Sequence, residues 1–318
     1  MADLAIRAAR DEDIPAILDT LRAALGESPV LRRTPELWAW KHVSNPFGPS
    51  LVFVAESHEG RIAGVRAMMR WRLATPSGHV LSCLRPVDTA THPDYARRGI
   101  FRRLTMTALD VAQAEGVHLV FNTPNDKSGP GYLRMGWREV GQIGVLIRPK
   151  VGRAIRPDAD QLPSIESWAP EATAVPASSM INDRAPRGLR TPRSGGYATW
   201  RFLSHPSASY GWVPDGVASG LIARAGARGG RSELVISEMV GSPRSTSIRS
   251  AARMSRARYL AGWFSNGSPE RKAALKGGLL PAPGVKPLHL IALSLSDLET
   301  DIHDLSAWDL ATSDLELL

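Results

Sequence analysis

The first half of the chain alternates between segments with the apolar period of a helix and segments with that of a strand. After an acidic start at Asp11, apolar residues recur three or four positions apart, at Ile14, Ile17, Leu18, Leu21 and Leu25. That spacing predicts a helix with one buried face, and residues 4–8 ahead of it predict a short strand. The sequence Thr34-Pro35-Glu36 predicts the start of a second helix, because threonine caps helices well and proline suits the first helical position.

Residues 51–91 predict a ladder of antiparallel strands. The strand-like runs are 51–56, 61–73 and 79–91, and glycine-containing turns separate them. Pro86 lies inside the last run. Because proline has no N–H to donate to a neighbouring strand, we expect a bulge or a splayed strand end there.

Further along, a helix is expected from Gly99 to Glu115, with one apolar face and an end at Gly116. Short strands are expected at 118–122 and 140–147. The predicted order is therefore strand, helices, antiparallel strands, helix, strand, helix, strand, which is an α/β arrangement.

The second half repeats features of the first at a constant offset. Leu37-Trp38-Ala39-Trp40-Lys41 is echoed by Tyr197-Ala198-Thr199-Trp200-Arg201, and Asn45-Pro46 by His205-Pro206. Two strands are expected near 218–225 and 232–240, and a helix near 246–258. Two short echoes can also arise by chance, so both interpretations stay open.

Composition and charge narrow the class of protein. The 318 residues, 43% of them hydrophobic, suffice for two domains of ordinary size, and the single cysteine, Cys83, excludes a disulfide framework within the chain. No apolar run has the length of a signal peptide or a membrane span, so we expect a cytoplasmic protein that does not enter a membrane. The net charge of +8 suits either nucleic acid or a cofactor with several phosphates, but the scattered arginines form no block, and nucleic acid is not expected as a partner. The histidines show no metal-ligand spacing, so no metal is expected.

A candidate phosphate site lies where the last of these strands runs into a helix. Residues 87–104 read VDTATHPDYARRGIFRRL, in which a strand ends near His92-Pro93 and Gly99 opens the helix. The first N–H groups of a helix have no partner within it, and the helix dipole adds positive charge there. Glycine also lets a ligand approach the backbone closely. The plain alternative is a solvated basic connection between a strand and a helix.

The segment HPDYARRGIFRRL resembles the acetyl-CoA-binding segment of the GNAT N-acetyltransferases. In that family a loop Gln/Arg-x-x-Gly-x-Gly/Ala wraps the CoA pyrophosphate, and here Ala96, Gly99 and Phe101 take its first, central and last positions. Ala96 and Phe101 depart from the pattern. The resemblance covers residues 3–148 and implies a GNAT fold, with a mixed, mostly antiparallel central sheet flanked by helices.

The resemblance also implies acetyl-CoA, or another acyl-CoA, as the cofactor. Backbone groups of three strand residues would hold the pantetheine arm and orient the thioester: Thr89, Ala90 and Thr91. The loop and the helix start would bind the pyrophosphate through Arg97, Arg98, Gly99, Ile100 and Phe101.

A second motif, with Asn125, Ser128, Tyr132, Gly136 and Trp137, resembles the family element N-x-x-A-x-x-x-Y-x-x-x-G-F. In the family the tyrosine hydroxyl lies near the CoA sulfur and can protonate the departing thiolate. The resemblance thus makes Tyr132 the catalytic acid and places Asn125 and Ser128 at the cofactor. The alternative is an ordinary half-buried tyrosine with a bonded hydroxyl. Residues 129–131, Gly-Pro-Gly, are expected to break or shorten the helix usually found here.

The base that takes the proton of the incoming amine is less defined. Asp88 lies on the central strand beside the expected thioester and is taken as the candidate catalytic carboxylate. Glu56 at the end of an earlier strand is a second option, and for both residues the plain alternative is an ordinary exposed carboxylate. The terminal carboxylate of Leu318 is a third, because some two-domain GNAT proteins use theirs.

The predicted organisation is a GNAT acetyl-CoA-binding catalytic domain at 1–148, a linker at 149–165 and a degenerate GNAT-like domain at 166–318. Residues 241–250 lack the glycine at the helix opening, and Ala273 and Ala274 stand where a tyrosine would be needed, so no second CoA site is expected. The implied function is direct acyl transfer from CoA to a primary amine of a small molecule. The alternatives are a non-catalytic acyl-CoA-binding or scaffold protein and a basic nucleic-acid binder. The oligomeric state is left open, with a homodimer as one option.

Overall fold

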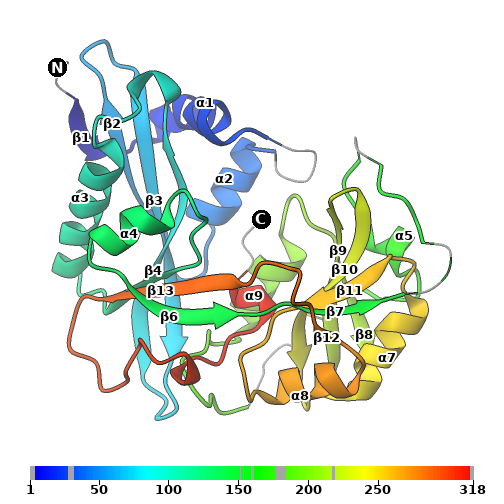
Figure 1. Cartoon of the computed structure of the whole chain (residues 1–318). Helices are drawn as coiled ribbons and strands as arrows, with labels where there is room; N and C mark the ends of the chain where they lie inside the picture. The colour runs from blue at the N-terminus through cyan, green and yellow to red at the C-terminus, as the bar shows by residue number, and fades with distance from the viewer. Residues whose placement is uncertain are drawn as a thin grey trace. The chain divides into compact units, whose positions relative to one another are not determined.

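The computed structural model describes residues 4–27, 32–150, 152, 154–158, 161–176, 184–216 and 219–315. The chain forms two compact units (Figure 1). Unit 1 comprises Met1–Leu73, Val80–Val140 and Leu290–His303, and unit 2 comprises Ala74–His79, Gly141–His289 and Asp304–Leu318. Leu318, the third option for a base, lies outside the described residues.

The sheet of unit 1 has seven strands in the order β1-β2-β3-β4-β5-β13-β6. Their bounds are β1 Ala5–Ala8, β2 Leu51–Glu56, β3 Ile62–Ala74, β4 Val80–Thr91, β5 Leu119–Asn122, β6 Arg138–Ile143 and β13 Leu288–Ser294. Strand β5 runs parallel to β4, whereas β1 with β2, β2 with β3 and β5 with β13 are antiparallel. The sheet is therefore mixed and mostly antiparallel, as predicted.

Helices cover both faces of this sheet. They are α1 Ile14–Leu25, α2 Pro35–His42, α3 Ile100–Ala114 and α4 Gly129–Arg134, with 3-10 turns η1 Asp11–Asp13 and η2 Pro93–Tyr95. Successive strand residues face opposite sides of a sheet. Accordingly, Val54 packs with residues of α1 and α2, while Phe53 packs with residues of α3.

The residues expected to begin these helices are found at their N-termini. The Thr34 side chain accepts a hydrogen bond from the Leu37 N–H at the start of α2. Gly99 caps α3 with a left-handed backbone, at φ 71°. The Gly-Pro-Gly sequence still forms a helix, α4, but one of six residues, with Pro130 in its first turn.

Strands β4 and β5 pair only at their beginnings. The parallel register joins Cys83 to Leu119 and Leu84 to Val120, and the pairing stops there. Just beyond, Asp88 has a φ of 42°, which an aspartate rarely adopts within a strand. The irregularity expected after Pro86 is thus confirmed, and it separates the two strands at the centre of the sheet.

Unit 2 has a sheet with the order β12-β7-β11-β10-β9-β8. Its strands are β7 Leu146–Pro149, β8 Tyr210–Pro214, β9 Gly220–Arg228, β10 Arg231–Val240, β11 Tyr259–Gly262 and β12 Leu280–Pro281. Its helices are α5 Ile165–Trp168, α6 Gly195–Ala198, η4 Thr199–Leu203, α7 Ser245–Met254, α8 Pro269–Lys276, η5 Leu305–Ala307 and α9 Thr312–Leu315. Strand β11 runs parallel to β10 and antiparallel to β7.

The two sheets exchange strands along the chain. Strand β7 follows β6 directly in sequence but joins the sheet of unit 2, whereas β13, late in the chain, lies between β5 and β6 in unit 1 (Figure 1). The predicted domains, 1–148 and 166–318 with a linker at 149–165, were drawn without such an exchange of strands. These limits stay a prediction.

Buried ion pairs hold the end of the described chain in unit 2. Arg193 lies 2.8 Å from a carboxylate oxygen of Asp314 and 2.6 Å from one of Glu238, and all three side chains are buried. The Ser313 hydroxyl also donates to Glu238. These contacts join α9 to strand β10.

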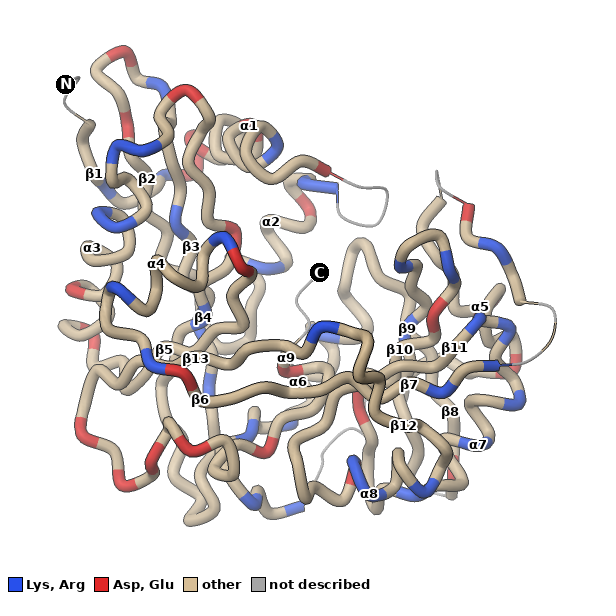
Figure 2. The backbone as a smooth tube through the Cα atoms, in the orientation of Figure 1, with Lys and Arg blue, Asp and Glu red and all other residues tan. Residues whose placement is uncertain are grey.

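Figure 2 shows Lys and Arg distributed along the whole chain among Asp and Glu, without a single basic block. None of the described helices has the length and apolar character needed to span a bilayer.

Candidate functional site

The irregular backbone of β4 places Asp88 against helix α2. One Asp88 carboxylate oxygen lies 3.1 Å from the Arg33 guanidinium, and the other lies 2.8 Å from Lys41 Nζ and 3.1 Å from His42 Nε2. The Asp88 side chain is 12% exposed, and the three partner side chains are 7% exposed or less. One carboxylate thus forms ion pairs with two cations that are almost out of contact with water.

This environment fixes the charge states of the cluster. Burial opposes ionisation of Asp88, but the charge of Lys41 and the hydrogen bond with His42 outweigh it and hold the pKa of the carboxyl well below its usual value. Burial lowers the pKa of His42, against the opposing effect of Asp88. The combination assigns a neutral imidazole that donates its Nε2–H to Asp88 and accepts at Nδ1 from the Ser50 hydroxyl, 2.9 Å away.

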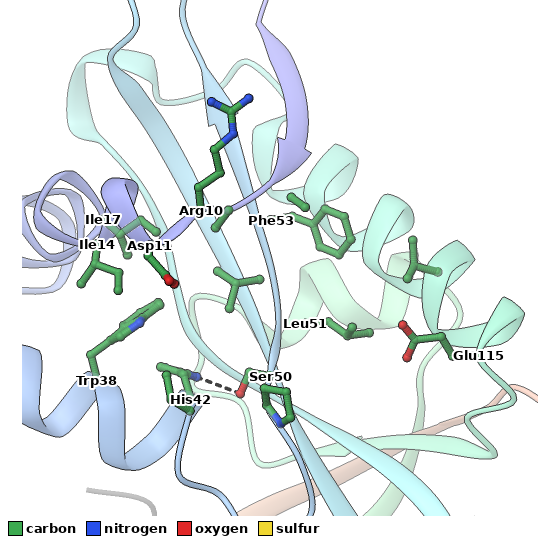
Figure 3. A pocket seen from close by; sticks show the side chains of 16 residues that line it. Arg10, Asp11, Ile14, Ile17, Trp38, His42, Ser50, Leu51, Phe53 and Glu115 are labelled. Carbon is green, nitrogen blue, oxygen red and sulfur yellow. Dashed lines mark hydrogen bonds between the residues drawn. The ribbon is translucent and has the colours of Figure 1, made fainter.

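The chain Ser50–His42–Asp88 connects the β4 irregularity to a pocket of about 470 Å³ at the edge of β2. Figure 3 shows His42 and Ser50 joined by their hydrogen bond in the wall of this pocket, with Trp38 beside His42. Phe53 and Glu115 lie on its α3 side. A carboxylate with so low a pKa is a weak proton acceptor, so the geometry suits Asp88 better to orienting His42 than to direct proton abstraction.

Tyr132, the predicted acid, is buried at 2% exposure rather than half-buried. Its hydroxyl oxygen accepts a hydrogen bond from Arg66 Nη1, at 2.7 Å. The edges of the Phe101 and Trp137 rings meet its ring, with centroids 5.3 and 5.1 Å away. The hydroxyl donates to no acceptor among the described residues, so its proton is not committed within that part of the chain.

The predicted pantetheine strand meets Tyr132 through Arg66. The same Nη1 atom of Arg66 donates to Thr89 Oγ1, also at 2.7 Å. Ala90 packs on the opposite side, with the residues of α1 and α2. Asp88 and Tyr132 therefore lie on opposite faces of the sheet, separated at the point where β4 and β5 stop pairing.

The predicted pyrophosphate loop has the features that anion binding requires. The helical hydrogen bonds of α3 begin with the Arg103 N–H donating to Gly99 O, so the N–H groups of residues 100–102 have no partner within the helix. Nothing lies within 4 Å of the position a Cβ would take on Gly99. Arg97, which has a φ of 63°, and Arg98 are exposed beside this opening, while Ile100 is buried and Phe101 half-buried.

Asn125 and Ser128 lie together in the turn before α4. The Asn125 side-chain oxygen accepts hydrogen bonds from the N–H groups of Lys127 and Ser128 and from the Ser128 hydroxyl. Their local role is to shape the turn that leads to Tyr132. The second option for a base, Glu56, forms an ion pair with Arg7 at 2.6 Å at the edge of the sheet.

Sequence reasoning missed the residues that surround these groups: Arg33, Lys41, His42, Ser50 and Arg66. The first four converge only through the packing of α2 on the sheet. Arg66 could have been found in the sequence, because a charged residue inside the apolar run IAGVRAMM of a buried strand is unusual and indicates a specific role. The described residues contain no cluster of three or more His, Cys, Asp or Glu side chains placed to hold a metal ion.

Comparison with known proteins identifies the fold. Residues 5–140 match the model of the acetyltransferase (GNAT) domain. A GCN5-related N-acetyltransferase from Anabaena variabilis is similar with a TM-score of 0.62 and 14% identity, over 92% of this chain and 73% of that one. One from Kribbella flavida has a TM-score of 0.59 and 13% identity, over 92% and 71%. A tandem GNAT protein from the clavulanic acid biosynthesis pathway has a TM-score of 0.56 and 15% identity, over 93% of this chain and 100% of that one.

At these identities the solved structures show the fold alone. No curated protein matches the sequence. The predicted fold class, a GNAT fold followed by a second GNAT-like half, is confirmed.

Proposed function

Since residues 5–140 belong to the GNAT acetyltransferase family, we propose that this protein transfers an acyl group, most simply acetyl, from CoA to a primary amine of a small molecule. The observation that carries the proposal is the hydroxyl proton of Tyr132, which finds no acceptor among the described residues, close to where β4 and β5 separate. Acid catalysis needs a donor with a free proton at a fixed place. The proposal involves neither nucleic acid nor a membrane, and it places the protein in the cytoplasm, where acyl-CoA is found.

The residues at the start of α3 fit the diphosphate of CoA. Three features match what a phosphate requires: N–H groups without a partner inside the helix at Ile100, Phe101 and Arg102, the open space at Gly99, and the exposed guanidinium of Arg98. Acyl-CoA supplies a thioester that an amine can attack. Backbone groups of residues 89–91 on β4 would orient it.

The side chains divide the proton transfers between the two faces of the sheet. On the α3 side, Tyr132 would give its proton to the leaving sulfur. On the α2 side, Asp88 stays ionised and orients the neutral imidazole of His42, and we assign the proton of the amine to this Asp88–His42 pair. Both assignments belong to the proposal.

Two measurements on the full chain test it. Isothermal titration calorimetry with acetyl-CoA and with CoA measures binding, and release of free thiol over a broad panel of primary amines measures transfer. We expect micromolar binding and thiol release that depends on at least one amine. Tyr132→Phe should keep the affinity for CoA and lower turnover by about 10²–10⁴-fold, the usual contribution of a positioned acid.

The competing function is acyl-CoA binding without catalysis. It is favoured by one observation, the Phe101 ring, which takes the last position of the loop and packs on Gly131. Binding of CoA with no thiol release on any amine would select this alternative. No binding at all would reject both.

A further inference from the structure

Arg66 is a wholly buried arginine at the centre of unit 1. It lies on β3 with no exposed surface, and its guanidinium donates hydrogen bonds to three hydroxyl oxygens. Nη1 reaches Thr89 Oγ1 and Tyr132 Oη, each at 2.7 Å, and Nη2 reaches Thr105 Oγ1 at 2.6 Å. The Cζ atom of Arg66 lies over the Phe101 and Tyr132 rings, 5.1 Å from the centroid of each.

The charge of Arg66 has no anionic partner in the described part of the chain. No carboxylate lies within ion-pair distance, and Arg66 Nε makes no hydrogen bond at all. Removing an arginine from water without a counter-charge is unfavourable, because rings and hydroxyls replace its hydration only in part. Arg33 and Lys41 show the contrast, since both form an ion pair with the Asp88 carboxylate.

We propose that Arg66 is the positioning residue that directs the proton of Tyr132, an inference that rests on the acyl transfer proposed above. Its Nη1–H occupies an acceptor site of the phenol oxygen, so the phenolic proton points to a different acceptor. The described residues offer no such acceptor. The leaving sulfur of CoA is the group of the proposed reaction that requires a proton.

The proton and charge balance gives Arg66 a second role. As the N–C bond forms and the C–S bond breaks, the sulfur leaves with the electron pair and takes the proton of Tyr132 Oη. The phenolate that remains faces a guanidinium already at hydrogen-bond distance, so the new negative charge meets the unpaired positive one. The proton that the Asp88–His42 pair takes from the amine nitrogen then returns through solvent and restores the phenol.

Arg66 also connects the acid to the predicted phosphate site. The Thr105 hydroxyl that accepts from Nη2 donates to Phe101 O, one turn earlier in α3, at 2.6 Å. Phe101 is the last residue of the predicted pyrophosphate loop. Because the bond from Thr105 to Phe101 O does not include the guanidinium, the first turn of α3 keeps it without Arg66, whereas Tyr132 loses a direct partner.

The test compares substitutions of Arg66 with a matched buried arginine. Arg66→Gln removes the charge, and Arg66→Lys keeps it while losing the fork of donors. Arg85 on β4 is the control: it is buried and lies over the Trp71 and Phe121 rings rather than the Tyr132 ring. All variants receive the same calorimetry with CoA and the same thiol-release assay, and thermal melting shows that each is folded.

We expect Arg66→Gln to lower kcat at least 100-fold while the Kd for CoA changes less than threefold. Arg66→Lys should retain an intermediate kcat, and Arg85→Gln should keep that of the wild type. The double variant Arg66→Gln/Tyr132→Phe should be no slower than Tyr132→Phe alone, because both changes remove one function. A merely structural arginine would give additive losses and weaker CoA binding.

Two results overturn the proposal, and they are distinguishable. If the wild type releases thiol and Tyr132→Phe is slow, but both Arg66 variants match the wild type, only the role of Arg66 is wrong. If the wild type binds CoA but none of the amines causes thiol release, the acyl transfer itself is rejected, and the role of Arg66 with it.

Discussion

Replacing Asp88 by asparagine removes one negative charge and leaves the shape of the β4 irregularity in place. Arg33 and Lys41 would then remain buried without their counter-charge, and His42 would face an amide in place of a carboxylate. Asparagine is the suitable replacement because it tolerates the positive φ of this position. Alanine would add about 1–2 kcal/mol of backbone cost and confuse the comparison.

The expected loss follows from the burial of the partners. An ion pair exposed to water contributes only about 0–1 kcal/mol. Breaking a buried pair by removing one partner costs about 3–5 kcal/mol, because the other charge stays buried and unpaired. The side chains here are 12% exposed or less, so the larger figure applies. A loss of that size raises the population of the open state of unit 1 roughly a hundredfold or more.

Hydrogen exchange read by mass spectrometry suits this protein, because two units need not unfold in a single step. Peptides covering 35–42 and 80–91 report on α2 and β4, and peptides from β10 serve as an internal reference. Asp19→Asn is the matched control, since Asp19 pairs with Arg22 on the surface at 75% exposure of its side chain. Adding Lys41→Met to Asp88→Asn should recover part of the loss.

The difference should also depend on pH in a defined direction. Asp88 has a folded pKa below its unfolded value of about 3.8, so its contribution is complete above that pH and declines as the pH falls toward the folded pKa. We expect the gap between the wild type and Asp88→Asn to be full at pH 7 and to shrink below about 3.8. A gap under 1 kcal/mol at pH 7, or one that widens in acid, would refute the reasoning.

Three further outcomes are expected. Gly131→Ala places a Cβ 2.8 Å from the Phe101 ring, at an overpacking cost of ~1–3 kcal/mol, and should weaken CoA binding about tenfold by calorimetry. Gly129→Ala is the control, because the nearest atom to its Cβ is 3.8 Å away and its affinity for CoA should not change. Equal affinities of the two variants would contradict the assigned loop. Arg193→Met should destabilise unit 2 by about 3–5 kcal/mol in hydrogen exchange, while Arg10→Met, at an exposed pair, should change little. Burial raises the pKa of the Cys83 thiol, so an aromatic disulfide reagent at pH 8 should label it only in denaturant, and rapid labelling of the native protein would show that β4 is not packed as described.

Local patterns in the sequence were sufficient for the elements of unit 1. The strand predicted at 51–56 is β2 itself, and the helix predicted from Gly99 to Glu115 is α3 at Ile100–Ala114. Both depend on neighbouring residues alone: an apolar period, a glycine at each end, and a turn sequence. The effect of Pro86 was also readable, because a missing N–H acts on its own strand.

Contacts between residues far apart in the sequence could not be predicted from local patterns. Strand β13 pairs with β5 through Ile291 and Asn122, and an isolated apolar run carries no mark of its partner. The cluster around Asp88 depends on which face of α2 meets the sheet, so the residue was found and its three partners were not. For the same reason the predicted roles of Asp88 and Tyr132 placed them at one site without revealing that they occupy opposite faces.

Unit 2 has a sheet with a similar irregular strand but lacks the residues of the predicted cofactor site. Its strand β10 runs parallel to β11 and shifts register against β9 between Ile236 and Glu238, and β4 has its own irregularity in the positive φ of Asp88. Glu238, like Asp88, is a buried acid held by two cations, here Arg190 and Arg193. It binds the α9 segment through Ser313 instead of orienting a histidine. The predicted cofactor site depends on a glycine and a phenol at fixed positions, and α7 and α8 supply neither there.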